Sequence, residues 1–347
     1  MSEYSTLQGN VEIARNTFTG VDKFGSFQQG VEASQKFEFV DNVVEFTGSS
    51  TGFGAEFLSA MVPTGQAEFD PMVISGNRFF STAPTGDLNS GATLHLGAYW
   101  TPGEVRQTPG IMFVNNSVER HQSSTNTNAL LFIESDYTGG IRMSESTFEA
   151  NPGASSISNN TYGADASVLA IDHVTSRGSI VATFGVNVSI SNSAIDGLGS
   201  PAVTSGNDAV VIGEGNVVAG ESSVLAGAKT VDDLLLGDLA DIGLGASFAR
   251  VPLAGSPVLD AGVAARSVED QRGVLGARAG LSDAGSVEVQ RALVTVGDAG
   301  EVAAGSDARF PVTVVEPGDT SFDVELTTVD GTAVAGSGFT STTQTVS

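Results

Sequence analysis

One short pattern recurs through the first 220 or so residues and limits the folds that this chain can adopt. In FEFVDNVVEF (residues 37–46), an apolar residue is followed by two free positions, a small polar residue, one free position and another apolar residue. Successive copies are 21 to 39 residues apart, which is the length of one supersecondary unit in a repeat protein. The polar positions are Asn16, Asn42, Asn77, Asn116, Ser146, Asp172, Ser193 and Asn216.

The spacing inside each copy requires a bend in the backbone. Phe37 and Phe39 have the period of two that places both side chains on one face of a strand. Val44 must face the same side, but it is five residues after Phe39. In a straight strand, residues an odd number of positions apart face opposite sides. The chain must therefore turn at Asn42, a residue type that tolerates the left-handed backbone region and whose amide can bond to equivalent amides in adjacent repeats. The pattern predicts a parallel β-helix with a ladder of stacked polar corners.

An all-β sandwich is the alternative fold, since it also has strands with alternating apolar residues. Separate hairpins, however, do not require a polar corner at a constant offset from the apolar pair. Further strands at 92–100 and 129–135 fit the other faces of each coil. The longest gaps between repeats predict loops at 81–91 and 101–110, and solenoids usually carry their binding surface on such loops.

Three segments follow from the change of pattern along the chain. Residues 1–231 are predicted to form the coils, and residues 232–290 a C-terminal end that caps the solenoid. Residues 291–347 again alternate apolar and polar positions around a DGT turn, which predicts an antiparallel β-sandwich. Because this last segment has too few strands to close a sandwich, we expect it to be incomplete.

The segment 232–290 contains LLLGDLAD, LAGSPVLDAG, DQRG and DAGSVE in that order. This order resembles the C-terminal segment of bacterial surface and secreted β-helix proteins, the pectin-lyase-like and polymorphic-outer-membrane-protein-like group. The resemblance implies a right-handed parallel β-helix for the coils. It differs in detail, since Arg250 stands where a histidine is common.

The stretch VELTTVDGTAVAGSGF (324–339) is similar to the Calx-β module, a calcium-binding immunoglobulin-like sandwich. Gly338 stands where that family commonly has an acidic calcium ligand. The acidic turns GDAGE and EPGD offer candidate cation ligands, and calcium is the only cofactor that the sequence indicates. These candidates are Asp298, Glu301, Glu316 and Asp319.

Composition excludes several classes of partner. Aspartate and glutamate outnumber lysine and arginine by 40 to 15, so a net charge of −25 repels nucleic acid and anionic membranes. The absence of cysteine excludes disulfides and thiolate metal sites. No run of 18 apolar residues occurs, and the opening MSEYSTLQGN is unlike a signal peptide. A secreted or surface location therefore requires that the chain be part of a longer, multidomain protein.

Few residues suggest catalysis. Glu119, Arg120 and His121 lie together in one turn, with Asp136 and Tyr137 in a neighbouring loop, and carboxylates beside a basic group are typical of polysaccharide-cleaving sites. The alternative is a solvated, charged turn. His173 is expected to stack outwards after a coil corner.

An aromatic pair suggests binding. Tyr99 and the only tryptophan, Trp100, precede the 101–110 loop and would form a platform for the apolar face of a sugar if exposed. Alternatively, they cover the solenoid core beneath the loop.

Two functions follow as hypotheses. The first is a non-catalytic structural or adhesive module of a large bacterial cell-surface or secreted protein, which presents a rigid β-helix face to a glycan or extracellular partner. The second is a carbohydrate-active enzyme, a polysaccharide lyase or glycoside hydrolase, with a cleft under the 81–110 loops. Carboxylates that converge on a basic side chain there would favour the enzyme.

Overall fold

The structure is a computed structural model with two compact units, Met1–Glu288 and Val289–Ser347. This division lies close to the boundary expected at residue 291. The described residues are 10–29, 36–47, 53–60, 70–81, 93–99, 110–121, 127–135, 140–160, 167–183, 187–206, 209–221, 224–242, 245–263, 269–276, 281–290, 292–303, 305–316, 323–330 and 332–346.

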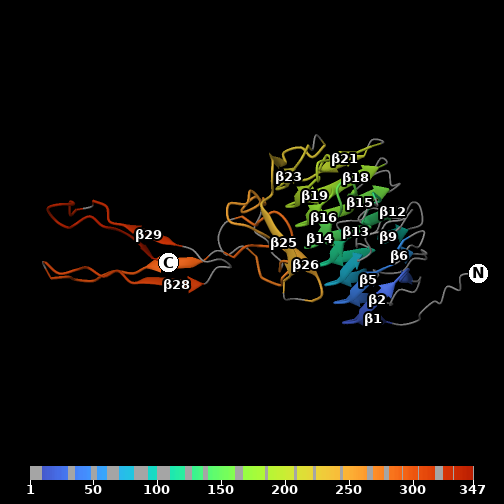
Figure 1. Cartoon of the computed structure of the whole chain (residues 1–347), viewed down its shortest axis with the longest axis horizontal. Helices are drawn as coiled ribbons and strands as arrows, with labels where there is room; N and C mark the ends of the chain where they lie inside the picture. The colour runs from blue at the N-terminus through green and yellow to red at the C-terminus, as the bar shows by residue number, and fades with distance from the viewer. Residues whose placement is uncertain are drawn as a thin grey trace, which may run out of the picture. The chain divides into compact units, whose positions relative to one another are not determined.

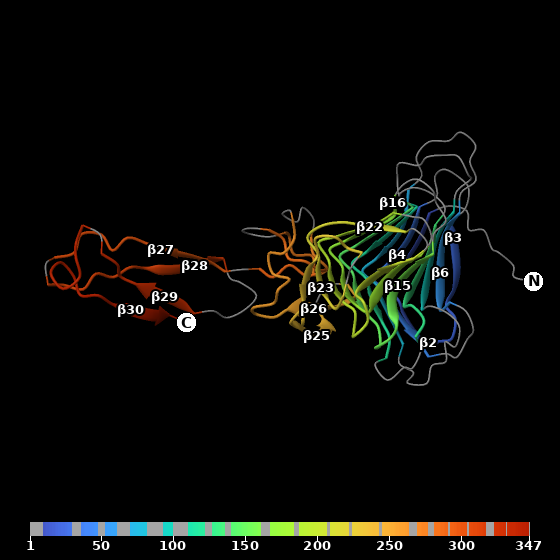
Figure 2. The same cartoon turned by 90° about the horizontal axis from the view of Figure 1, so that it is seen from above.

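The first unit is a parallel β-helix, as the repeat predicts. Each of the first seven coils contributes one strand to each of three sheets, and equivalent strands of successive coils pair in parallel (Figures 1 and 2). Sheet A contains β1 (Val11–Ala14), β4 (Phe37–Val40), β7 (Met72–Ser75), β10 (Ile111–Val114), β13 (Ile141–Ser144), β16 (Ser167–Asp172), β19 (Asn187–Ser191) and β22 (Val210–Ile212). Sheet B contains β2 (Thr17–Val21), β5 (Val43–Phe46), β8 (Arg78–Ser81), β11 (Ser117–Glu119), β14 (Thr147–Glu149), β17 (Thr175–Arg177), β20 (Ala194–Asp196), β23 (Val217–Ala219) and β24 (Lys229–Val231). Sheet C contains β3 (Gly25–Gln29), β6 (Ala55–Ala60), β9 (Leu94–Tyr99), β12 (Leu131–Ser135), β15 (Ser155–Asn160), β18 (Ser179–Thr183) and β21 (Val203–Ser205).

Alternate side chains of strands such as β4, β7 and β10 fill the interior. Phe39, Phe57 and Phe79 come from sheets A, C and B, and all three are fully buried. The rings of Phe39 and Phe57 are 5.3 Å apart, and those of Phe39 and Phe79 are 5.9 Å apart. Aliphatic residues such as Ile171 and Ile190 continue the core through later coils. Burial of this continuous column drives the winding, because no coil can cover its apolar residues alone.

The corner between sheets A and B consists of the ladder residue and the residue before it. The sequence predicts that the ladder asparagine itself makes the turn. The left-handed backbone is not at the ladder asparagine but at the residue before it, with φ between 48° and 70°. Most ladder residues, such as Asn42 and Asn77, direct their backbone N–H to a side chain in the next coil. These left-handed residues are Arg15, Asp41, Gly76, Asn115, Glu145, His173, Asn192 and Gly215.

The corner at Gly76 accepts a side chain only if Asp41 moves. Its φ is +69°, and a Cβ there would collide with the Asp41 carboxylate. Gly153 is a matched control, because its φ is +83° but a Cβ would meet nothing within 4 Å. We expect Gly76→Ala to lower the free energy of unfolding by about 2 kcal/mol and Gly153→Ala by about 1 kcal/mol, measured by urea denaturation. If both variants lose the same free energy of unfolding, the contact between the new Cβ and Asp41 is relieved without cost.

The C-terminal part of the first unit differs from the expected cap. The described residues within 245–288, here called the strap, follow β25 (Leu236–Asp241) and include its antiparallel partner β26 (Phe248–Pro252). The strap lies along the corner between sheets A and B, beside β14 (Figure 1). Ala246 donates a backbone hydrogen bond to Gly76 in the third coil, and Gly285 donates one to Asn192 in the seventh. The strap therefore covers the flank of the coils as well as packing Val258 against Val217 near their last turn.

The second unit contains two small antiparallel sheets. β27 (Leu293–Val296) pairs with β28 (Val312–Glu316), and β29 (Val324–Thr327) pairs with β30 (Thr343–Val346). Large apolar side chains stay exposed, including Phe310 at 52% and Val329 at 79%. The predicted sandwich is thus present only as two strand pairs without a buried core among the described residues.

Across the part of the chain that the structure describes, no helix is long and apolar enough to cross a membrane.

Candidate functional site

A row of side chains runs along the outer face of sheet C. Parallel pairing places these residues side by side in successive coils, while their neighbours, such as Phe57, Leu96 and Ile133, are fully buried. Because side chains alternate between the two faces of a strand, the row points away from the core. Its members are Ser26, Glu56, His95, Phe132, Ser158, Val181 and Thr204.

The middle of this row holds a cluster of charged and aromatic groups. Nδ1 of His95 is 3.3 Å from Oε1 of Glu56, and Nε2 is 3.7 Å from Oε2 of Glu134. Phe53, just before β6, stacks on the imidazole with ring centres 4.3 Å apart, and the Phe132 ring is 5.5 Å from it. We call these five residues the His95 cluster.

Burial sets the protonation of the imidazole. The His95 side chain is 7% exposed, and this burial lowers its pKa, against the hydrogen bond and charge of Glu56 and the charge of Glu134. The ring is therefore neutral at pH 7. A neutral imidazole that donates Nδ1–H to the Glu56 carboxylate has an acceptor lone pair on Nε2. Nε2 is buried and has no hydrogen-bond partner among the described residues.

The catalytic candidates from the sequence do not converge. Glu119 lies on sheet B, where both its carboxylate oxygens accept from Arg78 at 2.9 Å. Arg120 is 4% exposed and donates to the backbone carbonyls of Asn128 and Ala129. Burial lowers its pKa to about 10, so it stays charged and fixes the entry to β12. His121 is exposed. Glu119 and Arg120 therefore bind different partners, His121 is exposed, and the three side chains form no common site.

Most of the aromatic and loop candidates cannot be placed. Trp100, Asp136 and Tyr137 lie outside the described residues. Tyr99 is the last residue of β9, but its side chain is likewise outside the description. The sugar platform predicted at Tyr99 and Trp100 remains a prediction.

The polar corners do form a ladder. Asn42 donates through its backbone N–H and through Nδ2 to Oδ1 of Asn77, at 2.8 and 3.1 Å. Asn77 bonds to Asn116 in the same way, at 2.9 Å for both contacts. The column begins at Asn16 and continues to Ser146, whose Oγ accepts from the Asn116 backbone at 3.1 Å.

The assignment of Asp172 to this ladder is wrong. Strand pairing aligns Asp172 with Ser144 and Ser191, at the ends of their strands. Val174 occupies the ladder position, and its backbone N–H donates to Oγ of Ser193 at 3.1 Å. The column then resumes, as Ser193 donates to Asn216 at 2.9 Å.

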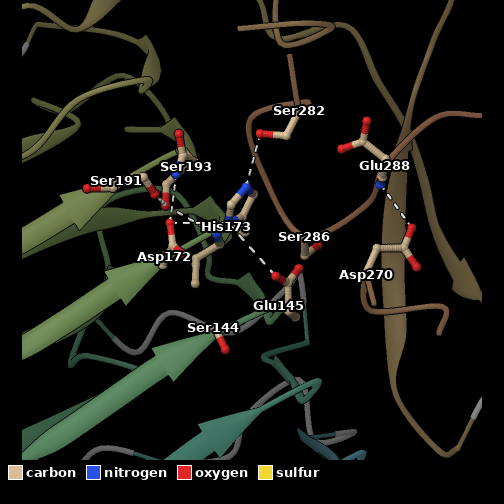
Figure 3. Close-up of polar contacts among 12 residues, drawn as sticks. Ser144, Glu145, Asp172, His173, Ser191, Ser193, Asp270, Ser282, Ser286 and Glu288 are labelled. Carbon is tan, nitrogen blue, oxygen red and sulfur yellow. Dashed lines mark hydrogen bonds and ion pairs between the residues drawn. The ribbon is translucent and has the colours of Figure 1, made fainter. Parts of the chain in front are cut away.

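A second polar cluster lies beneath the strap. His173 is not stacked outwards but is 6% exposed, with Nε2 3.2 Å from Oγ of Ser282 and Nδ1 3.1 Å from Oδ1 of Asp172 (Figure 3). Glu145 also faces the imidazole, with Oε1 3.9 Å from Nδ1. Nearby, Asp270 accepts the backbone N–H of Glu288 at 2.9 Å within the strap (Figure 3).

The order serine, histidine, aspartate is that of a catalytic triad, but burial argues against the chemistry. A nucleophile must reach its substrate, and Ser282 is completely buried. His173 instead joins the corner of the sixth coil to the strap. This cluster therefore fastens the strap.

Of the predicted cation ligands, the two whose side chains the structure describes, Asp298 and Glu301, are not part of a metal-binding group. Asp298 accepts the backbone N–H of Gly300 at 2.8 Å, and both Asp298 and Glu301 are exposed. Asp319 and the side chain of Glu316 lie outside the described residues. Within the described ranges, no three histidine, aspartate or glutamate side chains are grouped to hold a metal ion.

Sequence reasoning missed the His95 cluster. The strands 92–100 and 129–135 are identifiable from the sequence, and aligning the segment TLHLG (93–97) with the strands of adjacent coils could have placed His95 beside Phe132. Loops of unequal length between the strands concealed that register. Comparison with protein-family models, with curated proteins and with solved structures gave no significant match for this chain.

Proposed function

We propose that this chain is a non-catalytic structural and adhesive module of a large bacterial cell-surface or secreted protein, and that the outer face of sheet C binds a glycan or another extracellular partner. The Calx-β-like segment after the coils would be the first of the modules that continue such a protein. The C-terminal pattern that resembles pectin-lyase-like surface proteins supports this location.

The observation that carries the proposal is the in-register row on sheet C. Equivalent side chains in adjacent parallel strands are about 4.8 Å apart, so the row repeats small contact sites at a fixed interval. Its centre offers the partly exposed rings of Phe53 and Phe132, which suit the apolar face of a sugar. Several weak contacts along one rigid face would add up through avidity.

Charge supports the same choice of partner. With a net charge of −25, the chain repels nucleic acid and anionic lipid, while neutral or cationic ligands meet no such barrier. Polar and small residues such as Ser158 and Thr204 complete the row and can hydrogen-bond to hydroxyl groups.

A glycan array probed with the full chain tests the proposal. We expect binding that weakens on the order of tenfold in Phe132→Ala, because an aromatic contact is lost. Met112→Ala is the matched control, since Met112 lies on sheet A and its loss should leave binding unchanged. The proposal fails if no glycan or extracellular-matrix ligand binds, or if both variants lose binding equally.

One observation favours the carbohydrate-active enzyme as a second candidate. Glu56 and Glu134 flank His95 on β9, which lies between the 81–91 and 101–110 segments. Carboxylates beside a basic group are what such catalysis requires. Incubation with polysaccharides should then release reducing ends or unsaturated products, and Glu134→Gln should abolish the release. If the chain binds a polysaccharide through sheet C but releases no product from it, this candidate is excluded.

A further inference from the structure

We propose that the outer edge of β25, together with Leu235 and Leu253, binds an extended segment of a protein partner in which basic and aliphatic residues alternate. Such a segment would add a third strand to the small antiparallel sheet of β25 and β26. This surface is separate from the row on sheet C, so the proposal does not depend on glycan binding.

The first argument is an open strand edge. β25 is six residues long, and among the described residues it pairs only with β26. No residue of β25 is buried, whereas Ala249, Arg250 and Pro252 of β26 are buried, and β26 lies beside β14 of the coils. In a two-stranded sheet, about half of the backbone N–H and C=O groups of each strand point away from its partner. β25 therefore offers a row of backbone groups with which another strand can pair.

The second argument is a pair of apolar side chains at one end of this edge. Leu235, directly before β25, is 40% exposed, and Leu253, directly after β26, is 50% exposed. The Leu253 backbone N–H donates to the Leu235 carbonyl at 2.9 Å. The Leu253 side chain also lies against Gly237 of β25, where a Cβ would be 3.5 Å from its Cδ2. The two leucines thus stand next to each other beside the open edge.

The backbone of Leu235 indicates that its side chain has a role outside the fold. Its φ is 50°, in the left-handed region that glycine and asparagine adopt more readily than leucine. Asp233 fixes this turn, because its Oδ1 accepts the Leu235 N–H at 2.9 Å. A leucine here is disfavoured by its backbone and gains little from burial. Contact with a partner would give the exposed side chain the burial that the fold does not provide.

The charge around the edge selects the partner. Exposed aspartates lie within β25 or directly before it, at Asp232, Asp233, Asp238 and Asp241. If two copies of the chain paired through β25, these carboxylates would face one another, and the net charge of −25 would add to the repulsion. A strand with lysine or arginine at alternate positions instead forms cross-strand pairs of opposite charge. Its aliphatic residues would contact Leu235 and Leu253.

Two labelled peptides test the proposal with the full chain. The probe is a fluorescein-labelled peptide of sequence KLKVKVK, and the control is KLKPKVK, which has the same charge but cannot pair along its whole length because proline lacks an N–H. Fluorescence anisotropy is measured at about 0.15 M salt, where exposed charges are screened beyond roughly 8 Å. We expect saturable binding of the probe and much weaker binding of the proline peptide.

Matched variants locate the binding. Leu235→Asn suits the left-handed backbone, and both it and Leu253→Ser should weaken probe binding about tenfold, because an apolar contact is lost. Val210→Ser is the control, since it removes an apolar side chain of similar exposure, 51%, from β22 and should leave binding unchanged. Hydrogen exchange of the β25 amides should slow when the probe is bound, because added strand pairing protects them.

Three results would overturn the proposal. They are no saturable binding of KLKVKVK, equal binding of the proline peptide, and a loss in Val210→Ser as large as that in Leu235→Asn. Equal binding of the two peptides would identify charge attraction alone. The glycan array on sheet C is a separate measurement, so either proposal can fail while the other stands.

Discussion

Replacing Asn77 with alanine is expected to lower the free energy of unfolding by about 4 kcal/mol. Asn77 is fully buried in the middle of the ladder. Its Oδ1 accepts two hydrogen bonds from Asn42, and its Nδ2 donates to the carbonyl of Phe39 at 2.8 Å and to Asn116 at 2.9 Å. Alanine would leave two donors and two acceptors with weakened or missing partners inside the protein, and each such loss costs about 1 kcal/mol or more. Urea denaturation followed by circular dichroism measures the change.

Asn16 is the matched control at the start of the same column. Its side chain is exposed, and its Nδ2 donates to the carbonyl of Ala14 and to Asn42. No other asparagine in the described ladder donates to it, so Asn16→Ala should cost less than about 1 kcal/mol. Similar losses for Asn77→Ala and Asn16→Ala would contradict a ladder whose strength comes from buried, reciprocal bonds.

The second large effect is expected at the pair that joins the strap to sheet B. Arg250 donates to both carboxylate oxygens of Glu149, at 2.8 and 3.0 Å, and both side chains are less than 10% exposed. Arg250→Met would leave a buried carboxylate with only Arg177 beside it, which we expect to cost about 3 kcal/mol. Hydrogen exchange of the Gly285 and Ser286 amides, which bond to Asn192 and Thr175 of the coils, should accelerate with this loss.

Arg177→Met provides the comparison. Arg177 also bonds to Glu149, at 2.8 Å, but its side chain is 30% exposed and solvent screens its charge. Its removal should cost about 1 kcal/mol or less and leave strap exchange unchanged. If Arg177→Met proves as costly as Arg250→Met, the strap is not held by the buried pair.

The part of the fold that follows from local spacing could be predicted from the sequence. The odd offset between Phe39 and Val44 requires a corner, and Asn42 and Asn77 are indeed stacked at that corner. The same pattern misplaced Asp172, because the spacing was counted from Leu169. Ile171, two residues later on the same strand, is also buried and is the correct starting point. Counting from Ile171 gives Val174, an apolar residue that the pattern excludes.

The functional surfaces depend on contacts that local patterns do not contain. His95 pairs in sheet C with residues of the coils before and after it, and the segments that separate these strands differ in length. A fixed sequence spacing therefore does not reveal that His95 lies beside Glu56 and Phe132. The strap reaches even further, since Arg250 and Glu149 are 101 residues apart and no periodicity links them. His173 lies at a corner and its side chain is expected to point outwards, yet the strap buries it.

The absence of cysteine allows one direct measurement of the stacked register. Met112 and Arg142 face outwards on β10 and β13 and are paired residues, whereas Ser144 lies two positions further along β13. Paired positions in adjacent strands are about 5 Å apart, within the range of a disulfide, while Met112 and Ser144 should be about 8 Å apart. Oxidation should therefore cross-link a Met112→Cys, Arg142→Cys variant rapidly and a Met112→Cys, Ser144→Cys variant poorly. Equal cross-linking of both variants, or none in the first, would contradict coils stacked in this register.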